Sequence, residues 1–311
     1  MSGRVFVVGS MSADVTTFSQ RLPAPGETIH GDRLSLVLGG KGANQAIAAA
    51  RAGAATALIG CVGDDLFRDL VLDGLRAADV IVDGVRTVPG PTGVAHIRVD
   101  RHTGQNDIVI VAGANGALSG QDAERQLRAM GAGSGDVLLL QLEVPVTTSV
   151  HAARVAAGLG MIVVLDPAPA TELPDELWPA LTAVTPNESE AALLTGIPAG
   201  QPDAAKRAVR WFADRGVDHP IVTLAERGLV GVWDHQLRTL PAIPAEAVDT
   251  TAAGDAFAGA LGAALASGDS WADAVLRGSA AGAYAVTVEG ASPSLPTAAQ
   301  VDQVLAGATR A

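Results

Sequence analysis

Short runs of apolar residues alternate with alanine-rich segments along most of the chain. The runs with the length and composition of buried strands are Val5–Gly9, Ala57–Gly60, Val137–Gln141, Ile162–Leu165, Ala183–Thr185 and Ile221–Leu224. Between several of them lie segments such as Gly42–Ala52 and Val150–Gly158, which have the composition of helices. Continuous apolar strands that alternate with helices are typical of a parallel sheet covered on both faces. We therefore expect an α/β fold.

Two stretches break this rhythm, roughly residues 16–38 and 93–111. In the second, GVAHIRVD and NDIVIV alternate apolar with polar residues, which is typical of half-buried antiparallel strands. RHTGQN between them has the composition of a hairpin turn. We expect the two stretches to form a small β subdomain that covers an α/β domain of residues 1–15, 39–92 and 112–311. The alternative is an ordinary edge extension of the main sheet.

The composition argues against several classes of partner. Lys and Arg number 21 against 33 Asp and Glu, a formal net charge of −12, whereas nucleic-acid binding needs a basic face. No apolar run reaches the ~20 residues that cross a bilayer, and the N-terminus lacks the pattern of a signal peptide. The single cysteine, Cys61, excludes an intramolecular disulfide framework. We expect a cytoplasmic protein with small-molecule ligands and no nucleic-acid or membrane partner.

The strongest chemical signal is VDTTAAGD followed by AFAGALGAAL, residues 248–265. The second half is a good helix former, and amides at the start of a helix stabilise an anion. Asp255 lies where this helix begins. A carboxylate beside an anion site makes chemical sense if it removes a proton from a hydroxyl that attacks a phosphoryl group. The alternative is that Asp255 only caps the helix.

A second signal is LGGKGANQA, residues 38–46, which precedes another alanine-rich helix. Its glycines let a ligand lie against the backbone, and Asn44 offers both a donor and an acceptor to a hydroxyl. The GxxxxGK[ST] spacing of a Walker A loop is absent. The alternative is a glycine-rich turn between a strand and a helix.

Four further polar residues follow predicted strands: Asp14, Glu143, Asn187 and Glu190. Ligands of open α/β sheets bind beyond the carboxyl ends of the strands, so these side chains could converge on one site. Taken singly, each is more often a helix cap or a loop residue. The six histidines lack zinc-binding spacing and no serine lies in a GxSxG elbow, so we expect neither a zinc site nor a hydrolase triad.

Taken together, these motifs resemble the ribokinase (pfkB-type carbohydrate kinase) family from end to end. They are, in order, GSMSAD, PAPGETI, GGKGANQAIAAARAGA, GDD, TGVA, AGAN, LLLQLEVP, DPAPA, LPDELW, TPNESEAALLTGI, TLAERG, VDTTAAGDAF and GASPSLP. The resemblance implies a central, mostly parallel sheet flanked by helices, with a small β-sheet lid. It also implies transfer of a phosphoryl group from ATP to the primary hydroxyl of a sugar, with D-ribose giving D-ribose 5-phosphate as the leading candidate.

The resemblance further implies roles for individual residues. The general base is Asp255, and the amides around Ala252, Ala253 and Gly254 form the anion hole. The sugar-binding set is Ser12, Asp14, Gly40, Lys41, Gly42, Asn44, Glu143 and Asp255. The ATP-binding set is Asn187, Glu190, Thr223, Ala225, Glu226, Gly228, Gly254 and Ser279, with Mg²⁺ held through water at Glu190. The set for an activating K⁺ is Asp249, Thr251, Ala285, Val288, Gly290 and Ser294.

The sequence departs from the family pattern at two places. Ser12 stands where Asn is usual, and the nucleotide loop has Ala225 where Gly is usual, with Ser279 near the expected adenine position. Other substrates therefore stay open, namely another pentose, a hexose, a sugar acid or a nucleoside. A catalytically idle sugar-binding sensor is the alternative from another class. The resemblance also implies a homodimer that pairs through the lid strands.

Overall fold

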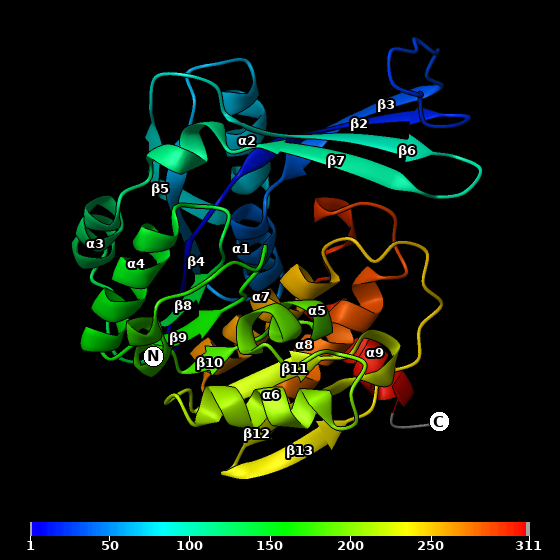
Figure 1. Ribbon diagram of the computed structural model, residues 1–311. Coiled ribbons are helices and arrows are strands. Elements are labelled where there is room, and N and C mark those ends of the chain that lie inside the picture. Colours follow the sequence, from blue (N-terminus) through cyan, green and yellow to red (C-terminus); the bar gives the residue numbers. More distant parts are fainter. Residues whose placement is uncertain (1, 309–311) are drawn as a thin grey trace.

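A nine-stranded sheet forms the centre of the molecule in the computed structural model, which describes residues 2–308 (Figure 1). Its strands, in spatial order, are β13 (Gln236–Leu240), β12 (Leu229–Trp233), β11 (His219–Thr223), β10 (Ala183–Val184), β9 (Ile162–Leu165), β8 (Val137–Leu140), β1 (Val5–Val8), β4 (Thr56–Val62) and β5 (Val80–Thr87). The pairs β13–β12 and β12–β11 are antiparallel, and the pairs from β11 to β5 are parallel. The expected mostly parallel sheet is confirmed.

Helices cover both faces of this sheet. One face packs against α1 (Lys41–Arg51), α2 (Phe67–Ala77), α7 (Ala253–Ser267), α8 (Trp271–Ala285) and α9 (Ala298–Ala308). The other packs against α3 (Gly120–Ala129), α4 (Val146–Gly158), α5 (Glu188–Thr195) and α6 (Ala204–Ala213). Short 3-10 helices span Gly113–Ala117, Asp175–Ala180, Ala225–Arg227 and Ser292–Ser294. Because both faces are buried, β1 is apolar throughout: Val5 and Val7 enter one core, and Phe6 and Val8 enter the other.

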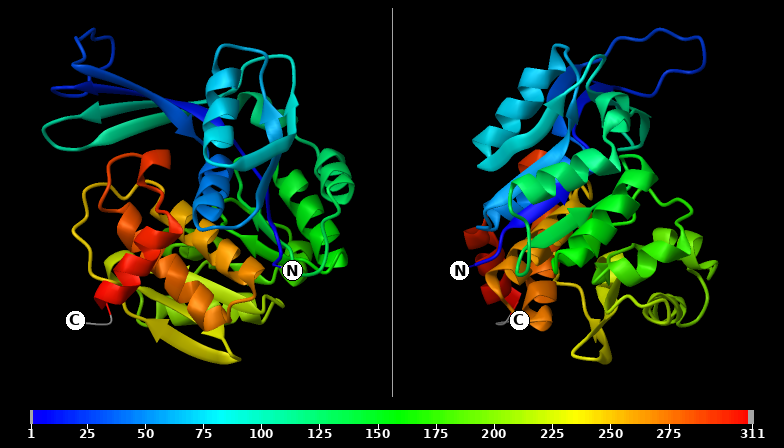
Figure 2. Two further views of the ribbon diagram at one scale, coloured as in Figure 1. Left: turned by 180° about the vertical axis from the view of Figure 1, so that it is seen from behind. Right: turned by 90° about the vertical axis from the view of Figure 1, so that its left-hand side faces the viewer.

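A second, four-stranded sheet projects from the main body (Figures 1 and 2). Its strands, in spatial order, are β3 (Arg33–Gly39), β2 (Ser12–Ser19), β6 (Gly93–Asp100) and β7 (Asn106–Val111). The outer pairs are antiparallel, and β2 and β6 are parallel. This lid sheet shares no strand with the main sheet, so the alternative of an edge extension is wrong. β2 follows β1 after a short connection, which joins the two sheets at the site described below.

The lid sheet is less buried than its alternating pattern predicts. On β7 the exposed fractions of Ile108 and Ile110 are 51% and 60%, and those of Val109 and Val111 are 60% and 53%. On β3, Leu34 is 66% exposed. Both faces of β7 are therefore open to solvent, and the expectation of half-buried strands is wrong for β7, although its antiparallel pairing with β6 is as expected. Within residues 2–308, no helix is long and apolar enough to cross a bilayer.

Candidate active site

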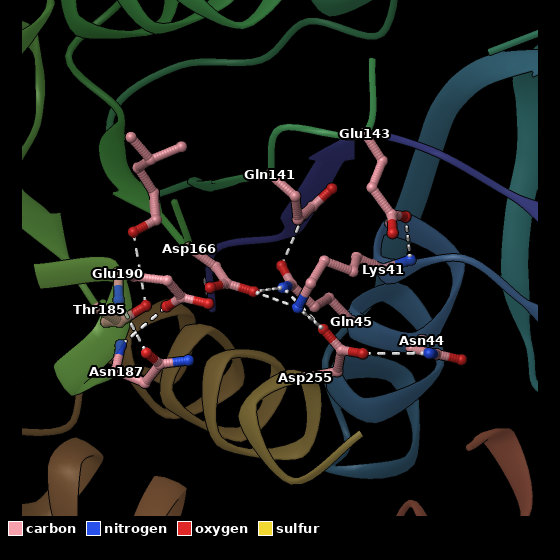
Figure 3. Close-up of polar contacts among 12 residues, drawn as sticks. Lys41, Asn44, Gln45, Gln141, Glu143, Asp166, Thr185, Asn187, Glu190 and Asp255 are labelled. Carbon is pink, nitrogen blue, oxygen red and sulfur yellow. Dashed lines mark hydrogen bonds and ion pairs between the residues drawn. The ribbon is translucent and has the colours of Figure 1, made fainter. Parts of the chain in front are cut away.

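Charged and amide side chains gather where β8 and β9 end and where α1 and α7 begin (Figure 3). Figure 3 shows Lys41, Asn44 and Gln45 of α1 beside Asp255 of α7 and beside Asp166, which follows β9. Lys41 is partly exposed, and the other four are buried. Buried charged and amide groups require partners, and here they find them in one another.

Asp255 is held by three side chains of α1. Its Oδ2 accepts a hydrogen bond from Nδ2 of Asn44 at 3.1 Å, and its Oδ1 accepts one from Nε2 of Gln45 at 3.1 Å. Nζ of Lys41 lies 3.5 Å from the same Oδ1. The N-cap residue of α7 is Ala252, and no side chain caps this helix. The alternative in which Asp255 serves only as a helix cap is therefore wrong.

The beginning of α7 is open toward the site. Ala252 has φ 61°, which turns the chain into the helix, and a Cβ placed on Gly254 would meet no atom within 4 Å. The first amides of a helix have no intrahelical partner, and the positive end of the helix dipole lies there. Among the described residues, no side chain caps α7, and the Ala253 amide reaches only the Thr250 carbonyl, at 3.4 Å, so this helix start has the electrostatics of an anion site.

Lys41 joins two buried carboxylates. Its Nζ lies 3.1 Å from Oδ2 of Asp166 and 3.5 Å from Oδ1 of Asp255. Burial disfavours the ammonium charge, but the Asp166 and Asp255 carboxylates outweigh burial and raise the pKa of Lys41 above its ordinary value. Burial raises the pKa of the Asp166 carboxyl, against the pull of Lys41. A single ammonium thus balances part of the negative charge that this cluster concentrates.

Two further carboxylates, Asp14 and Glu143, face the same space. Oε2 of Glu143 accepts hydrogen bonds from Oγ of Ser10 at 2.5 Å and from the backbone amide of Lys41 at 2.9 Å. Oδ1 of Asp14 accepts from Oγ of Ser12 at 2.8 Å. Burial raises the pKa of Asp14 to about 6 against that hydrogen bond, and the charges on Glu143 and Asp255 add to the effect. The structure therefore brings the predicted sugar-binding carboxylates together beside Asp255.

The glycines before α1 allow the backbone to pass close to these groups. A Cβ on Gly39 would lie 2.1 Å from Oδ2 of Asp14, and a Cβ on Gly42 would lie 2.6 Å from the Ser10 amide nitrogen. Gly40 has φ 91°, a conformation that favours glycine. These glycines are therefore required, at least in part, by the close packing of a turn between a strand and a helix, which was the alternative interpretation of residues 38–46.

Asn187 and Glu190 form a capping box at the start of α5. Oδ1 of Asn187 accepts from the Glu190 amide at 2.9 Å, and Oε2 of Glu190 accepts from the Asn187 amide at 2.8 Å. Burial raises the pKa of Glu190. An isolated parallel bridge joins Asn187 to Thr223 and places this box beside the predicted nucleotide loop. Both residues therefore have a structural role, whatever ligand they also serve.

The predicted nucleotide loop, Thr223–Gly228, is a tight turn after β11. Gly228 has φ 92°, and Ala225 has φ 49°, a left-handed conformation that costs a residue with a Cβ more than glycine. Glu226 is exposed. Ser279 lies half-buried on α8, in a different element. The Ala225 departure therefore falls at a position whose backbone favours glycine.

Two members of the predicted cation set, Thr251 and Gly290, contact Asp249. Its Oδ2 accepts from the Gly290 amide at 2.8 Å, and its Oδ1 accepts from Oγ1 of Thr251 at 2.6 Å. Burial acts in the other direction, but these donors lower the pKa of Asp249 and keep it ionised. The Asp249 amide also donates to the carbonyl of Val286 at 3.2 Å, which brings the end of α8 alongside. The other members of the set, Ala285, Val288 and Ser294, end α8 or follow it.

Comparison with known proteins decides the family. Residues 2–298 match the model of the pfkB family of carbohydrate kinases. This chain belongs to that family. It is 39% identical to a ribokinase of Haemophilus influenzae over 94% of each chain. It is 34% identical to a deoxyribokinase of Salmonella typhi, over 97% of this chain and 98% of that one. The solved structure of an Arabidopsis thaliana ribokinase complexed with ribose and ATP matches with a TM-score of 0.88 at 32% identity, over 98% of this chain and 99% of that chain.

Membership of the pfkB family confirms the expected fold and the expected class of enzyme, a kinase that acts on a sugar. Three buried residues that the sequence analysis did not single out complete the cluster around Asp255, namely Gln45, Gln141 and Asp166. Each lies inside one of the family motifs, GGKGANQ, LLLQLEVP or DPAPA, and these motifs were the only signal for them in the sequence.

Proposed function

We propose that this protein transfers the γ-phosphoryl group of ATP to the primary hydroxyl of D-ribose, giving D-ribose 5-phosphate and ADP. The observation that carries the proposal is the buried carboxylate of Asp255 at the uncapped start of α7, with Asp14 and Glu143 facing it. The site thus combines a base, an anion-binding helix end and acceptors for sugar hydroxyls. The ribokinase relatives support ribose as the substrate.

Asp255 is the general base of the proposed reaction. It takes the proton of the primary hydroxyl while the hydroxyl oxygen bonds to the γ-phosphorus. The bond from that phosphorus to the β–γ bridging oxygen breaks, and ADP leaves. The amides around Ala252, Ala253 and Gly254 stabilise the charge on the transferring group, because they are fixed before the reaction begins.

The sugar is bound by the groups before and within α1 together with the two facing carboxylates. Asp14 and Glu143 accept hydrogen bonds from hydroxyls and set the register of the sugar, and Ser12 orients Asp14. Gly40 and Gly42 let the sugar approach the backbone. Lys41 and Asn44 contact Asp255 in this structure and exchange part of those contacts for the sugar.

ATP is bound beside the loop Thr223–Gly228, with the capping box of Asn187 and Glu190 on the phosphate side and Ser279 on the adenine side. Oε2 of Glu190 is the oxygen that accepts the capping hydrogen bond, which leaves Oε1 for a water of a hydrated Mg²⁺. Within residues 2–308 no cluster of three or more His, Cys, Asp or Glu side chains could hold a metal ion, which fits contact through water and phosphate. When bound, Mg²⁺ would neutralise part of the charge on the phosphate groups.

We propose that a monovalent cation, K⁺, binds at the turn around Asp249. The proposed oxygen ligands of the cation are the ionised Asp249 carboxylate, Thr251, the buried hydroxyl of Ser294 and the backbone near Ala285, Val288 and Gly290. The cation supplies positive charge next to the anion hole. Replacement of K⁺ by Na⁺ is expected to lower the rate clearly, measured as ADP release, and equal rates in the two salts would contradict this part of the proposal.

The lid sheet, residues 16–38 and 93–111 with the start of β2, closes over the sugar and excludes water from the transferring group. The exposed apolar side chains of β3 and β7 form the surface through which two copies pair as a homodimer. We expect the protein to act in the cytoplasm.

Position 12 makes 2-deoxyribose the second candidate substrate. Ser12 replaces the usual Asn beside Asp14, and a deoxyribokinase is among the relatives. ADP release with K⁺ and MgATP should therefore be compared across D-ribose, 2-deoxyribose, arabinose, fructose, 2-keto-3-deoxygluconate and adenosine. A preference for ribose of about tenfold in kcat/KM, ~1.4 kcal/mol in the transition state, is expected. Another preferred substrate overturns the ribose assignment and leaves the kinase assignment in place.

The Asp255→Asn variant tests the base. The amide keeps the shape of the side chain but cannot take the proton, so we expect near-total loss of turnover with sugar binding retained, measured by calorimetry. Substantial residual turnover would refute the assignment of Asp255 as base. If the parent protein phosphorylates none of the sugars tested, the result would instead favour the catalytically idle sugar-binding sensor.

A further inference from the structure

Gln45 and Gln141 are two fully buried glutamines that the proposed chemistry leaves unused. Gln45 lies in the first turns of α1, and Gln141 follows β8. Nε2 of Gln45 donates to Oδ2 of Asp166 at 2.9 Å and to Oδ1 of Asp255 at 3.1 Å. Both hydrogens of this amide are therefore spent on two carboxylates that come from different parts of the chain (Figure 3).

The direction of this hydrogen-bond chain is fixed by the two carboxylates, which only accept from Nε2 of Gln45. Oε1 of Gln45 is thereby turned away from the carboxylates and accepts from Nε2 of Gln141 at 2.5 Å. The other end of the Gln141 amide, Oε1, is buried and has no hydrogen-bond partner within residues 2–308. A flipped Gln45 amide would turn its oxygen toward two carboxylates and its nitrogen toward a donor. Oε1 of Gln141 lies over Gly9, where a Cβ would come within 2.0 Å of it. A glycine at position 9 thus makes room for the Gln141 amide that donates to Gln45.

Gln45 differs from the other two residues that hold Asp255. Lys41 keeps 27% of its side chain exposed, and Lys41 and Asn44 are proposed to contact the sugar. Gln45 is 0% exposed and is anchored on both sides, by Gln141 and by Asp166. It is therefore the contact of Asp255 that stays when the sugar redirects its neighbours.

We infer that Gln45 is a positioning residue for phosphoryl transfer, which fixes the orientation of the Asp255 carboxylate through a buried chain from Gln141 to Asp166 and Asp255. The inference rests on the proposed function, in which Asp255 is the base. A misplacement of about 1 Å of a reacting group can cost roughly 100-fold in rate. Gln45 acts on the rate of transfer and not on the affinity for sugar or ATP.

The first test compares Gln45→Met with Gln141→Met. Both changes replace a fully buried glutamine by an apolar chain of similar length, but only Gln45 touches Asp255. We expect kcat to fall about 100-fold in Gln45→Met and about tenfold or less in Gln141→Met, with KM for each substrate changed less than about threefold. Calorimetric titration with the sugar must still give one binding site per chain. If the fraction of chains that bind sugar falls as much as kcat does, the variant is partly unfolded and the inference is contradicted. A kcat within twofold of the parent also overturns it.

The second test places Gln45→Met in the Asp255→Asn background. If Gln45 acts only through Asp255, the second change has no further effect on the residual rate. A further loss as large as in the parent means a general structural role and overturns the inference. Should Gln45→Met fail to fold, Gln45→Asn keeps an amide in the site but is one methylene too short to reach both carboxylates, and parental kcat in that variant overturns the inference as well. Failure of the proposed function is seen separately, as turnover by Asp255→Asn alone.

Discussion

Strands of similar apolar content lie in two different environments in this molecule. Leu139 on β8 of the main sheet is 0% exposed, whereas Ile110 on β7 of the lid sheet is 60% exposed. The main sheet has helices on both faces, and β7 is the edge of a single layer that extends away from the body (Figure 2). The number of layers, and not the residue type, therefore decides what each strand contributes to stability.

The largest expected effect tests this difference directly. Leu139→Ala removes a side chain that packs against Gly262 of α7 and leaves a cavity, so we expect a loss of ~2–5 kcal/mol in the free energy of unfolding. Ile110→Ala, measured on dilute protein, should cost less than ~1 kcal/mol because its side chain is mostly solvated. Urea denaturation measures both.

The same pair also tests pairing between copies. If the lid sheet of one chain covers that of another, the loss in Ile110→Ala grows with protein concentration, because association stabilises the folded chain by mass action. A loss in Ile110→Ala as large as in Leu139→Ala at every concentration would mean that the lid sheet is buried within the single chain, which would break the comparison.

The sequence predicted the central strands well because a strand buried on both faces is apolar throughout, as VLLL of β8 is. It did not predict β5 and β13, which are the edge strands and carry polar residues such as Asp83 and Arg238. It also did not predict β12, although its sequence, LVGVW, is apolar. Asp255 was identified from a local motif. Gln45, Gln141 and Asp166 were not, because their partners lie across the sheet and α1 and no local pattern shows such contacts.

The next effect in size concerns Gly39, where the lid sheet meets the buried site. A methyl group on Gly39 would lie 2.1 Å from Oδ2 of Asp14, so Gly39→Ala must displace that carboxylate. We expect kcat/KM for the sugar to fall roughly 100-fold, mainly through KM, because a misplaced contact loses about this much. Gly116→Ala is the matched control, since a Cβ there would meet no atom within 4 Å. Equal kinetics in the two variants would show that Asp14 does not bind the sugar.

The smallest expected effect is a pH dependence set by the same carboxylate. Burial, helped by Glu143 and Asp255, raises the pKa of Asp14 to about 6. Protonation below that pH removes the charge and turns one of its two accepting oxygens into a donor, which weakens its hydrogen bonds with the sugar hydroxyls. We expect kcat/KM for the sugar to fall about tenfold per pH unit below ~6. Because the folded-state pKa lies above the ordinary value of 3.8, the contribution of Asp14 to stability is greatest at low pH and falls as pH rises toward 6. Activity and this stability contribution thus change in opposite directions.

Ser12 offers the control for that assignment. Its hydroxyl donates to Oδ1 of Asp14 and lowers the pKa of that carboxyl, so Ser12→Ala should move the acid limb of the profile to higher pH. An acid limb that stays in place in Ser12→Ala would belong to another carboxyl of the cluster, with Asp166 the first candidate because burial raises its pKa as well. The lid strand β2 would then contribute shape to the site, while the titrating group would lie in the buried cluster beneath it.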